Sequence, residues 1–452
     1  LFTRVSAVNV STAHPAGIPF KTTKQVELAN KAGRNLQSET WVCAPSTGSG
    51  QVAPGQYERI AWTVRQFDDF GRVTSTRNSA GAISESAWGC CGRESEKDAS
   101  GVESWFLYDA LRRQDGVVKE ASPDIVRIYS LDPVGRTLTN TVTAGGLAAT
   151  TIGAYDRAGR QTSSVDQAGL VTQYSFQEGG RISVMVGPGH ATNITETYPG
   201  GKTKSIAGNA VTPQYYVYGA EADGTQWTIV YSGAAGTNSP VWTKTVTDML
   251  GRTIREERPG FSVFSAFLVV TNSSFFNPKG QLVRSTTTGA PDTLYEYDEL
   301  GEQVRSGLDI DGNGVLDLAG PDRVTESASY YDFRAEPEPQ GEGWWRVTAS
   351  AVYAAEGSAA STTTSVQRTR LTGLGLPSGL GLLTSESVSL DLLGNETVSR
   401  SYVARDAKTV TQIVTFPDST NEAVTVSVNG LLVSSTSKTG VRSDFSHDAI
   451  ER

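Results

Sequence analysis

The sequence lacks any run of eighteen consecutive apolar residues, so it predicts no helix that could cross a membrane. It is also poor in cysteine: only Cys43, Cys90 and Cys91 are present, which is too few for a disulfide framework. The three histidines lie far apart in the chain, so they do not complete a four-ligand zinc site with these thiols. Helical membrane proteins, small disulfide-rich domains and zinc modules are therefore excluded as classes.

Basic residues are fewer than acidic ones. The chain has 39 Lys and Arg against 48 Asp and Glu, which gives a formal net charge of -9 and a pI near 5.1. A surface of this sign repels nucleic acid and anionic lipid, so we expect no nucleic-acid partner and no membrane insertion. Helical heptads rich in Lys and Glu are absent, whereas 47 Gly and abundant Thr, Ser and Val favour turns and strands. The composition predicts an all-β fold.

A short motif recurs along the chain and defines its repeat. The clearest copy, Tyr-Asp-Arg-Ala-Gly-Arg, runs from Tyr155 to Arg160. A second turn signal, Asp-Gln-Ala-Gly, begins at Asp166, and the next copy begins at Phe176, twenty-one residues after the first. Further copies stand at 67–72, 88–93, 108–113, 132–136, 248–252 and 447–452, with weaker ones at 30–34, 277–281, 298–302 and 391–395.

Each position of the motif has a physical reason. Asp can accept hydrogen bonds from the amides that follow it in a tight turn, and Gly supplies the positive φ that reverses the chain. The flanking residues alternate between apolar and polar, as from Val424 to Val428 ahead of the hairpin signal Asn429-Gly430. We expect the aromatic residues to stack as a ladder across strands about 4.8 Å apart. The Arg is expected to pack its stem over that ladder and to pair with a turn carboxylate.

One unit is thus two short strands and two turns in roughly twenty-one residues. A single unit cannot bury its apolar face, so neighbouring hairpins must stack into a continuous antiparallel sheet. Because sheets twist with a fixed hand, a long strip of hairpins should spiral. His447 stands where other copies carry an aromatic residue, so it is predicted to fill the same position.

The motif resembles that of the RHS/YD-repeat family, approximately Tyr-Asp-x-x-Gly-Arg with a Gly-x-x-Thr-x-Tyr-x-Tyr-Asp lead-in. The resemblance implies a β-strip that spirals into a hollow cocoon. In polymorphic toxins and insecticidal toxin complexes of this family the shell encloses a C-terminal toxin, and related repeats occur in adhesive cell-surface proteins. The family's shell-closing region with its autoproteolytic aspartates has no counterpart here, and Leu131 to Gly135 is predicted to be an ordinary turn.

The match divides the chain into segments of different regularity. Residues 66–182, 241–310 and 385–452 carry regular repeats, whereas 1–65 and 183–240 carry degenerate ones. Residues 311–384 are expected to form an irregular insert with a calcium loop candidate and a Gly-rich crossover. The chain starts at Leu1 and stops inside a repeat, so we expect it to be part of a longer polypeptide.

The best ligand candidate is an acidic loop. Side chains of Asp309, Asp311, Asn313 and Asp317, with the carbonyl of Val315, offer oxygens in the pattern of a calcium loop, with Gly at the sixth position. The twelfth position holds Gly rather than the usual Glu, and strands rather than helices flank the loop. The alternative is a polar hairpin tip whose Asp and Asn residues only satisfy the turn.

Two pairs of adjacent residues, one of cysteines and one of tryptophans, are further candidate sites. Cys90 and Cys91 occupy a turn as two reduced thiols, as a vicinal disulfide, or with one of them paired to Cys43. Trp344 and Trp345 either form a sugar-stacking platform or place one ring in the core and one at an edge. Gly-x-Ser-x-Gly, P-loop and HExxH signatures are absent, so no catalytic residue and no enzyme activity is expected.

The sequence therefore predicts a structural segment of a secreted or cell-surface β-shell that encloses or presents another polypeptide. Its partner would be the rest of its own polypeptide or a toxin-like cargo. One alternative is a cell-surface adhesive or glycan-binding array. Another is a self-assembling extracellular β-filament, because exposed edge strands favour self-association.

Overall fold

The computed structural model describes residues 2–9, 23–43, 57–260, 268–335, 342–353 and 356–450. These residues form one sheet of 35 strands in which every paired neighbour is antiparallel. Three short 3₁₀ turns interrupt it: η1 (Glu178–Gly180), η2 (Pro188–His190) and η3 (Gly236–Asn238). The described part of the chain contains no helix of the length and apolarity that crossing a membrane requires.

The first eighteen strands are β1 (Phe2–Asn9), β2 (Thr23–Ala29), β3 (Asn35–Cys43), β4 (Tyr57–Phe67), β5 (Val73–Asn78), β6 (Ile83–Trp88), β7 (Arg93–Lys97), β8 (Glu103–Tyr108), β9 (Gln114–Lys119), β10 (Ile125–Leu131), β11 (Thr137–Ala144), β12 (Leu147–Tyr155), β13 (Gln161–Val165), β14 (Val171–Gln177), β15 (Ile182–Val186), β16 (Thr192–Thr197), β17 (Thr203–Ala207) and β18 (Gln214–Ala220).

The remaining strands are β19 (Gln226–Ser232), β20 (Trp242–Thr247), β21 (Thr253–Gly260), β22 (Leu268–Phe276), β23 (Leu282–Thr287), β24 (Asp292–Tyr297), β25 (Gln303–Asp309), β26 (Arg323–Ala335), β27 (Glu342–Tyr353), β28 (Thr362–Arg370), β29 (Pro377–Ser378), β30 (Gly381–Leu390), β31 (Glu396–Ala404), β32 (Thr409–Thr415), β33 (Ala423–Val428), β34 (Leu431–Thr436) and β35 (Arg442–Asp444).

The pairing follows the order of the chain, as expected for stacked hairpins. Successive strands pair throughout, except that β28 pairs with β30 and the short β29 adds only a small ladder to β30. Because strands alternate in direction, successive turns fall on alternate edges of the strip. We call the edge that carries the turns at 68–72, 109–113, 132–136 and 156–160 the motif edge, and the edge that carries those at 78–82, 98–102, 145–146 and 166–170 the counter edge.

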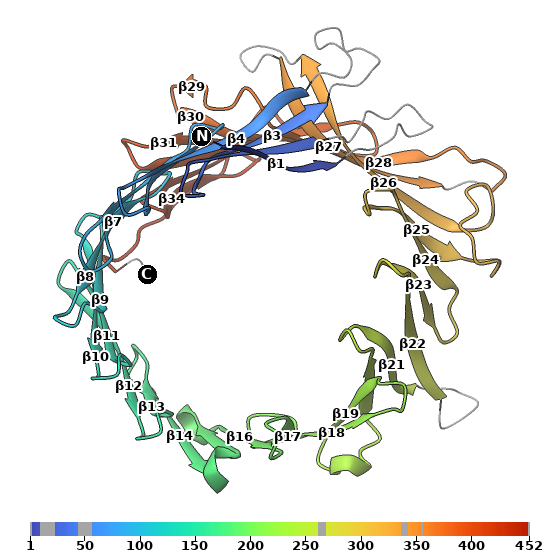
Figure 1. The fold of residues 1–452 in the computed structure, drawn as a ribbon, viewed down its shortest axis with the longest axis horizontal. Coiled ribbons are helices and arrows are strands. Elements are labelled where there is room, and N and C mark those ends of the chain that lie inside the picture. The colour runs from blue at the N-terminus through green and yellow to red at the C-terminus, as the bar shows by residue number, and fades with distance from the viewer. Residues whose placement is uncertain are drawn as a thin grey trace.

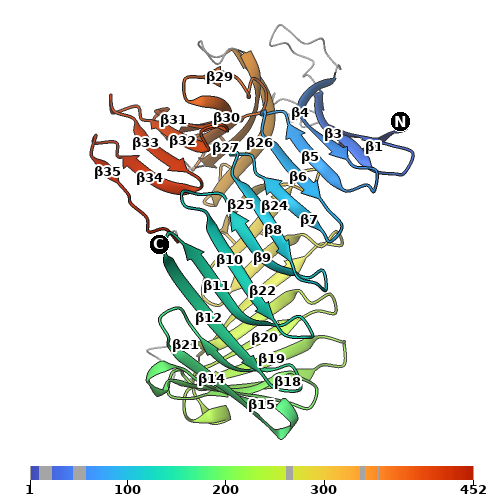
Figure 2. The same cartoon turned by 90° about the vertical axis from the view of Figure 1, so that its left-hand side faces the viewer.

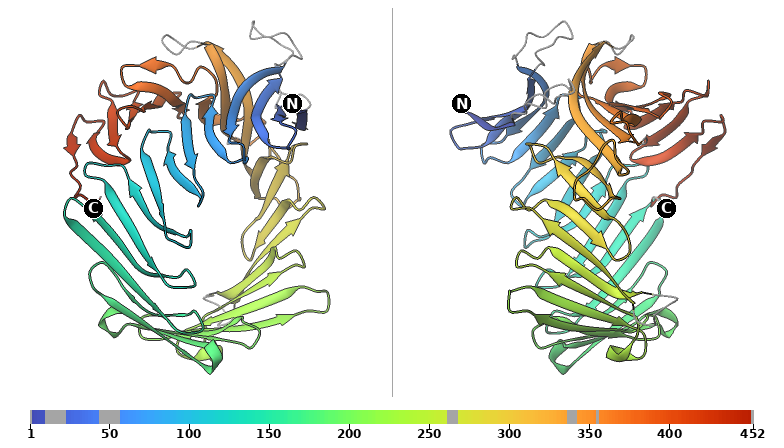
Figure 3. Two further views of the ribbon diagram at one scale, coloured as in Figure 1. Left: turned by 60° about the vertical axis from the view of Figure 1, so that its left-hand side comes forward. Right: turned by 90° about the vertical axis from the view of Figure 1, so that its right-hand side faces the viewer.

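The strip curls into a ring that continues past one full turn (Figure 1). The last strands, from β27 to β35, lie alongside the first ones, as Figures 2 and 3 show from other sides. The twist that antiparallel strands impose on one another accumulates over the sheet and accounts for this curl. The predicted fold, antiparallel hairpins of about twenty-one residues stacked into a spiralling sheet, is confirmed.

A seam joins the two overlapping turns of the spiral. Arg405 pairs with Glu85 at 2.6 Å and Lys408 pairs with Glu120, across 320 and 288 residues of sequence. The carbonyl of Arg405 also lies so close to Gly101, whose φ is +94°, that a Cβ there would collide with it. The motif edge of the second turn of the spiral therefore rests on the counter edge of the first turn of the spiral.

Two of the four buried clusters in the described residues lie where this seam brings two turns of the spiral together. Trp344 packs with Val42 and Ile60. It also donates a hydrogen bond to Glu58 in β4, which lies 286 residues earlier in the sequence. A second cluster adds Ala449 and its neighbour Ile450 to three buried residues of the first turn, namely Ile125, Val142 and Ala144. A single sheet has only one layer of side chains on each face, so the overlap supplies packing that one turn cannot make alone.

The segment 311–384 is ordered around the longest hairpin of the chain. Strands β26 and β27 pair over twelve positions. The Gly-rich residues 371–380, which were expected to form a crossover, connect β28 to β30, and these two strands pair with each other. Trp344 and Trp345 are both buried, with 2% and 1% of their surface exposed. The sugar platform is wrong, because both rings are buried: Trp345 packs with Val347 and Val388, and Trp344 packs on Val42 and Ile60 at the counter edge of the first turn of the spiral.

Candidate functional site

The motif turn is a clamp built on its aspartate. In the turn at 156–160, Asp156 Oδ1 accepts the backbone N–H groups of Ala158 and Arg160, both at 2.9 Å. Its Oδ2 accepts Arg160 Nε at 2.8 Å. Gly159 takes φ +86°, which lets its N–H reach the Asp156 carbonyl at 3.0 Å. One carboxylate thus closes the turn and holds the arginine, as the motif predicts.

The same clamp recurs along the motif edge with little variation. The Arg Nε to Asp Oδ2 distance is between 2.6 and 2.8 Å in each copy. At one turn Arg112 replaces the glycine and takes φ +62° itself, so the clamp tolerates a side chain there. The clamps are Asp68–Arg72, Asp109–Arg113, Asp132–Arg136, Asp156–Arg160 and Asp248–Arg252.

Each of the five clamps also reaches the next repeat. In four of them the guanidinium lies over the aromatic ring that precedes the following motif turn. In the fifth, Leu131 stands in the place of the ring, and Arg113 donates Nη1 to the carbonyl of Asp132 at 2.7 Å. The expected packing of the arginine over the rings is confirmed in these four repeats, where the arginine lies between successive motif rings; a direct contact of ring on ring occurs at Tyr198 and Tyr218, with centroids 6.1 Å apart. The stacked pairs are Arg72–Trp88 (5.4 Å), Arg136–Tyr155 (5.0 Å), Arg160–Phe176 (4.4 Å) and Arg252–Phe276 (4.4 Å), measured to the ring centroid.

The polar tips of several motif rings bond back to the strand before them. In four copies the tip bonds to a backbone carbonyl fifteen residues earlier, at the start of the preceding strand. His447 makes this bond as Trp and Tyr do elsewhere, so the prediction that it fills their position is confirmed. The pairs are Trp88–Val73 (2.7 Å), Tyr108–Arg93 (2.9 Å), Tyr297–Leu282 (2.8 Å) and His447–Leu432 (2.8 Å).

The clamp lowers the pKa of each of its aspartates below the ordinary value of 3.8. For Asp109 and Asp156 the largest cause is the backbone N–H of the arginine four residues on; burial opposes it, and the guanidinium adds to it. For Asp68, Asp132 and Asp248 burial is the largest single influence and raises the pKa, but the hydrogen bonds together outweigh it. The clamp aspartates are therefore held as carboxylates.

The acidic loop between β25 and β26 lies on the counter edge. Asp309 and Asp322, at its two ends, are only 4% and 2% exposed. Asp309 accepts backbone N–H groups at positions 312, 313 and 314 (2.8, 3.1 and 2.9 Å), and Asp322 accepts those at 310 and 317 (2.8 and 2.9 Å). Two buried carboxylates therefore organise the loop from inside, and hydrogen bonds satisfy both.

Three carboxylates of this loop converge. One oxygen each from Asp309, Asp311 and Asp322 lies within 4.8 Å of the others. Because calcium binds oxygens at about 2.3–2.6 Å, three oxygens at this spacing can share one ion. Asn313 instead directs its side-chain nitrogen at Asp311 and at Asp317, at 3.0 and 2.5 Å. The donor set is all oxygen, which fits a hard divalent cation.

The predicted ligands are thus brought together only in part. Asp309 and Asp311 belong to the converging group, whereas Asp317 contacts Asn313. The backbone N–H of Val315 donates to Asn313 Oδ1 at 2.8 Å, which places Val315 in the same turn. Sequence reasoning left Asp322 out of the ligand set because it lies beyond the loop pattern. Its position just ahead of the returning strand is the signal that could have found it.

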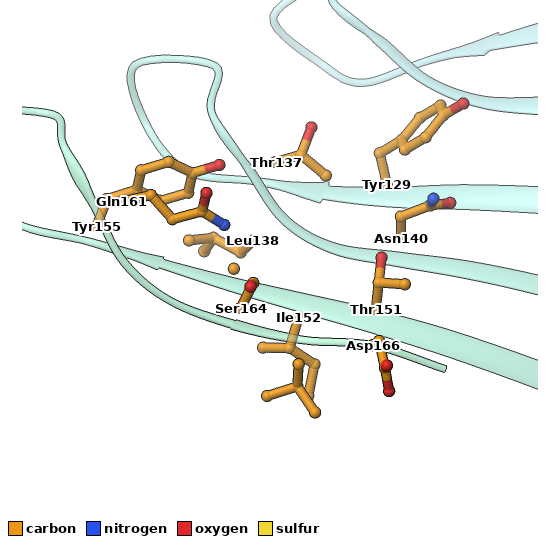
Figure 4. A pocket seen from close by; sticks show the side chains of 12 residues that line it. Tyr129, Thr137, Leu138, Asn140, Thr151, Ile152, Tyr155, Gln161, Ser164 and Asp166 are labelled. Atoms are coloured by element: carbon orange, nitrogen blue, oxygen red, sulfur yellow. The ribbon is translucent and has the colours of Figure 1, made fainter. Parts of the chain in front are cut away.

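A shallow groove of about 450 Å³ crosses the sheet at β10 to β13 (Figure 4). Tyr129 and Tyr155 lie at opposite ends of it, with hydroxyl and amide side chains between them. Asp166 is the one carboxylate among the lining residues. A pair of carboxylates for general acid–base chemistry is therefore not assembled in this groove.

The cysteine pair lies at the turn between β6 and β7. Cys90 is exposed, Cys91 is half-buried, and both are free. Their sulfur atoms are 3.0 Å apart. The side chain of Cys43, the third partner considered, lies outside the described residues.

The family model described as RHS Repeat matches residues 155–203, which begin with the clearest copy of the motif. A search among curated proteins found no match.

Several solved structures are similar to the chain at 11% identity. They include the crystal structure of TcdB2-TccC3 without its hypervariable C-terminal region (TM-score 0.40, covering 95% of this chain and 24% of that one). They also include TcdB2-TccC3-Cdc42 (TM-score 0.34, 90% and 25%) and the Photorhabdus luminescens Tc holotoxin pore (TM-score 0.29, 95% and 32%). The chain spans about a quarter to a third of the length of these structures.

Proposed function

We propose that this chain, which contains an RHS repeat at residues 155–203, is a wall segment that encloses or presents another polypeptide. Its function is mechanical: it holds a continuous sheet between a cargo and the surrounding solvent. The proposal assigns the chain no catalytic role. The cargo, a toxin-like polypeptide or another part of the same chain, and an extracellular or cell-surface location are inferred from the family resemblance.

The observation that carries the proposal is the seam. A strip that only displayed ligand sites could remain open, whereas this one overlaps itself and packs its motif edge on its own counter edge. The ion pairs Arg405–Glu85 and Lys408–Glu120 and the packing of Trp344 lie along that overlap. Stacking of successive turns of the spiral, each docked edge to edge on the one before, builds a wall that further turns could extend.

Imaging of single particles of the purified chain tests the wall directly. The expected result is a ring-like particle with its ends overlapped, and a straight or open strip would contradict it. The containment step is tested with a reporter polypeptide fused after Arg452. We expect the reporter to resist added protease when the wall is intact.

A charge reversal at the seam supplies the matched control. The double variant Arg405→Glu and Lys408→Glu places like charges against Glu85 and Glu120, so the overlap should loosen and the reporter become cleavable. Adding Glu85→Arg and Glu120→Lys restores opposite charges and should restore protection. Equal cleavage in all three proteins would reject containment.

A glycan-binding array is the second candidate, favoured by the groove of Figure 4. Two tyrosine rings flank hydroxyl and amide groups there, a combination that suits sugar recognition. Glycan-array binding that is lost in a Tyr129→Ala and Tyr155→Ala variant would support this function. A regular filament in the images would instead support self-assembly.

A further inference from the structure

The turn at 88–93 on the motif edge lacks the aspartate that closes the five clamp turns. In its sequence, Trp-Gly-Cys-Cys-Gly-Arg, Gly89 stands where those five turns carry the clamp aspartate. The turn is closed by a backbone bond from Gly89 N–H to the Gly92 carbonyl at 2.9 Å. Arg93 pairs with Glu96 on its own strand, β7, instead of with a turn carboxylate. This hairpin therefore has no side-chain lock of the clamp type.

The two residues between these glycines are cysteines with adjacent sulfur atoms. The Sγ atoms of Cys90 and Cys91 lie 3.0 Å apart, and neither is bonded to another partner in the described chain. Side chains pack closely on both glycines: the Glu94 carboxylate lies against Gly89, and the Tyr108 ring and hydroxyl lie against Gly92. The dithiol is thus held at the tip of a tightly packed turn.

We propose that Cys90 and Cys91 are a redox site that closes this turn covalently when the protein meets a small disulfide such as oxidised glutathione. The resulting vicinal disulfide takes the place of the missing aspartate clamp. Strained and exposed disulfides are readily reduced again, so the lock is reversible in the presence of a thiol.

The chemistry proceeds by two exchanges. Exposed Cys90, as the thiolate, attacks one sulfur of the small disulfide; a mixed disulfide forms and one small thiolate leaves. Cys91 then loses its proton and attacks the Cys90 sulfur, which expels the second small thiolate. The protein gives up two electrons and two protons, and the small disulfide becomes two thiols. The Cys90 thiol raises the pKa of Cys91, consistent with Cys90 reacting first.

The turn is also where the preceding clamp docks. Arg72 donates Nη1 to the Gly89 carbonyl at 3.0 Å and lies over the Trp88 ring. Closing the ring of atoms between Cys90 and Cys91 restricts the backbone beside that carbonyl. We therefore expect oxidation to slow hydrogen exchange in β6 and β7 relative to the reduced protein.

Intact-mass measurement after incubation with oxidised glutathione tests the site. A Cys43→Ser background removes the third thiol. The expected product is lighter by about 2 Da, the mass of two hydrogen atoms, and no longer reacts with maleimide. In the same background Cys90→Ser and Cys91→Ser should each gain one glutathione, about 305 Da, and lose nothing.

Several results would overturn the proposal. These are a protein that carries stable glutathione on the pair, one that stays reduced, or a wild-type disulfide that joins Cys43 to either thiol. Hydrogen exchange of residues 83–97 supplies the second measurement, before and after oxidation and after re-reduction by dithiothreitol. A vicinal disulfide that leaves this exchange unchanged would refute the locking role.

Discussion

The guanidinium of Arg160 lies 4.4 Å from the centre of the Phe176 ring, one repeat further along the chain. The same guanidinium pairs with Asp156 in its own turn. The arginine therefore contacts two successive repeats and stabilises the packing of one on the next. Stability in such an array is a sum of repeat and nearest-neighbour contributions.

Removal of one shared arginine should have a local effect. In Arg160→Ala we expect amide exchange in β12 to β15 to rise about two- to fivefold, because a cation–π contact contributes about 0.5–1 kcal/mol. Strands from β18 onward should be unaffected. The control is Arg157→Ala in the same turn, an exposed residue that should change nothing. Equal effects of the two variants, or a uniform rise along the chain, would contradict the clamp.

The clamp aspartates predict a loss of stability in acid. The pKa of Asp156 lies below 3.8 in the folded chain and near 3.8 in the unfolded one. Its contribution is therefore complete above pH 3.8 and is lost as the pH falls through the lowered folded value. Urea unfolding between pH 5 and pH 2 should show Asp156→Asn weaker than wild type at pH 5 and equal to it at the acid end. Asp69→Asn, outside any clamp, should follow wild type throughout.

Substitution of two adjacent tryptophans should distinguish packing at the seam from packing within one turn of the spiral. Trp344→Ala and Trp345→Ala should each cost about 3–5 kcal/mol, since both rings are buried. Only the first should increase hydrogen exchange in β3 and β4, because Trp344 packs there on Val42 and Ile60. Trp345→Ala should act on β28 and β30 around Val388. If both variants disturb the same strands, the seam is not an independent contact.

The acidic loop should bind calcium. Titration calorimetry is expected to show one site with a Kd of about 10⁻⁴ M, and chelation should lower the melting temperature. Asp311→Asn, an exposed member of the converging group, should abolish the heat without unfolding the chain. Asp223→Asn, in an exposed turn elsewhere, is the control. A calcium-free melting curve identical to the calcium-loaded one, with no heat of binding, would leave only the polar-turn interpretation.

The repeat was predictable from sequence because its contacts are local. Asp156 bonds to residues two and four positions on, so the spacing of Asp, Gly and Arg already describes the turn. The packing of Arg160 over an aromatic ring was also expected, but not that this ring, Phe176, belongs to the next repeat. The interposed arginine appears only when the strands are placed side by side.

The seam could not be predicted, since it joins positions about three hundred residues apart that share no pattern. The separations between hydrogen-bonded partners are 286, 288 and 320 residues. Burial of both Trp344 and Trp345 follows from that overlap and from the long β26–β27 hairpin. Asp322 joins the acidic group because β26 returns beside β25, a tertiary relation that the loop pattern does not contain.

The seam joins residues that lie about three hundred positions apart, so it can form only late in the synthesis of the chain. Hairpins can form as they leave the ribosome, because each needs only its neighbour. The counter edge of the first turn must wait for roughly three hundred further residues before its partner exists, and long loops close slowly. During that interval Val42 and Ile60 lack their cover, so the nascent chain is most prone to mispairing and most dependent on chaperones at its earliest strands.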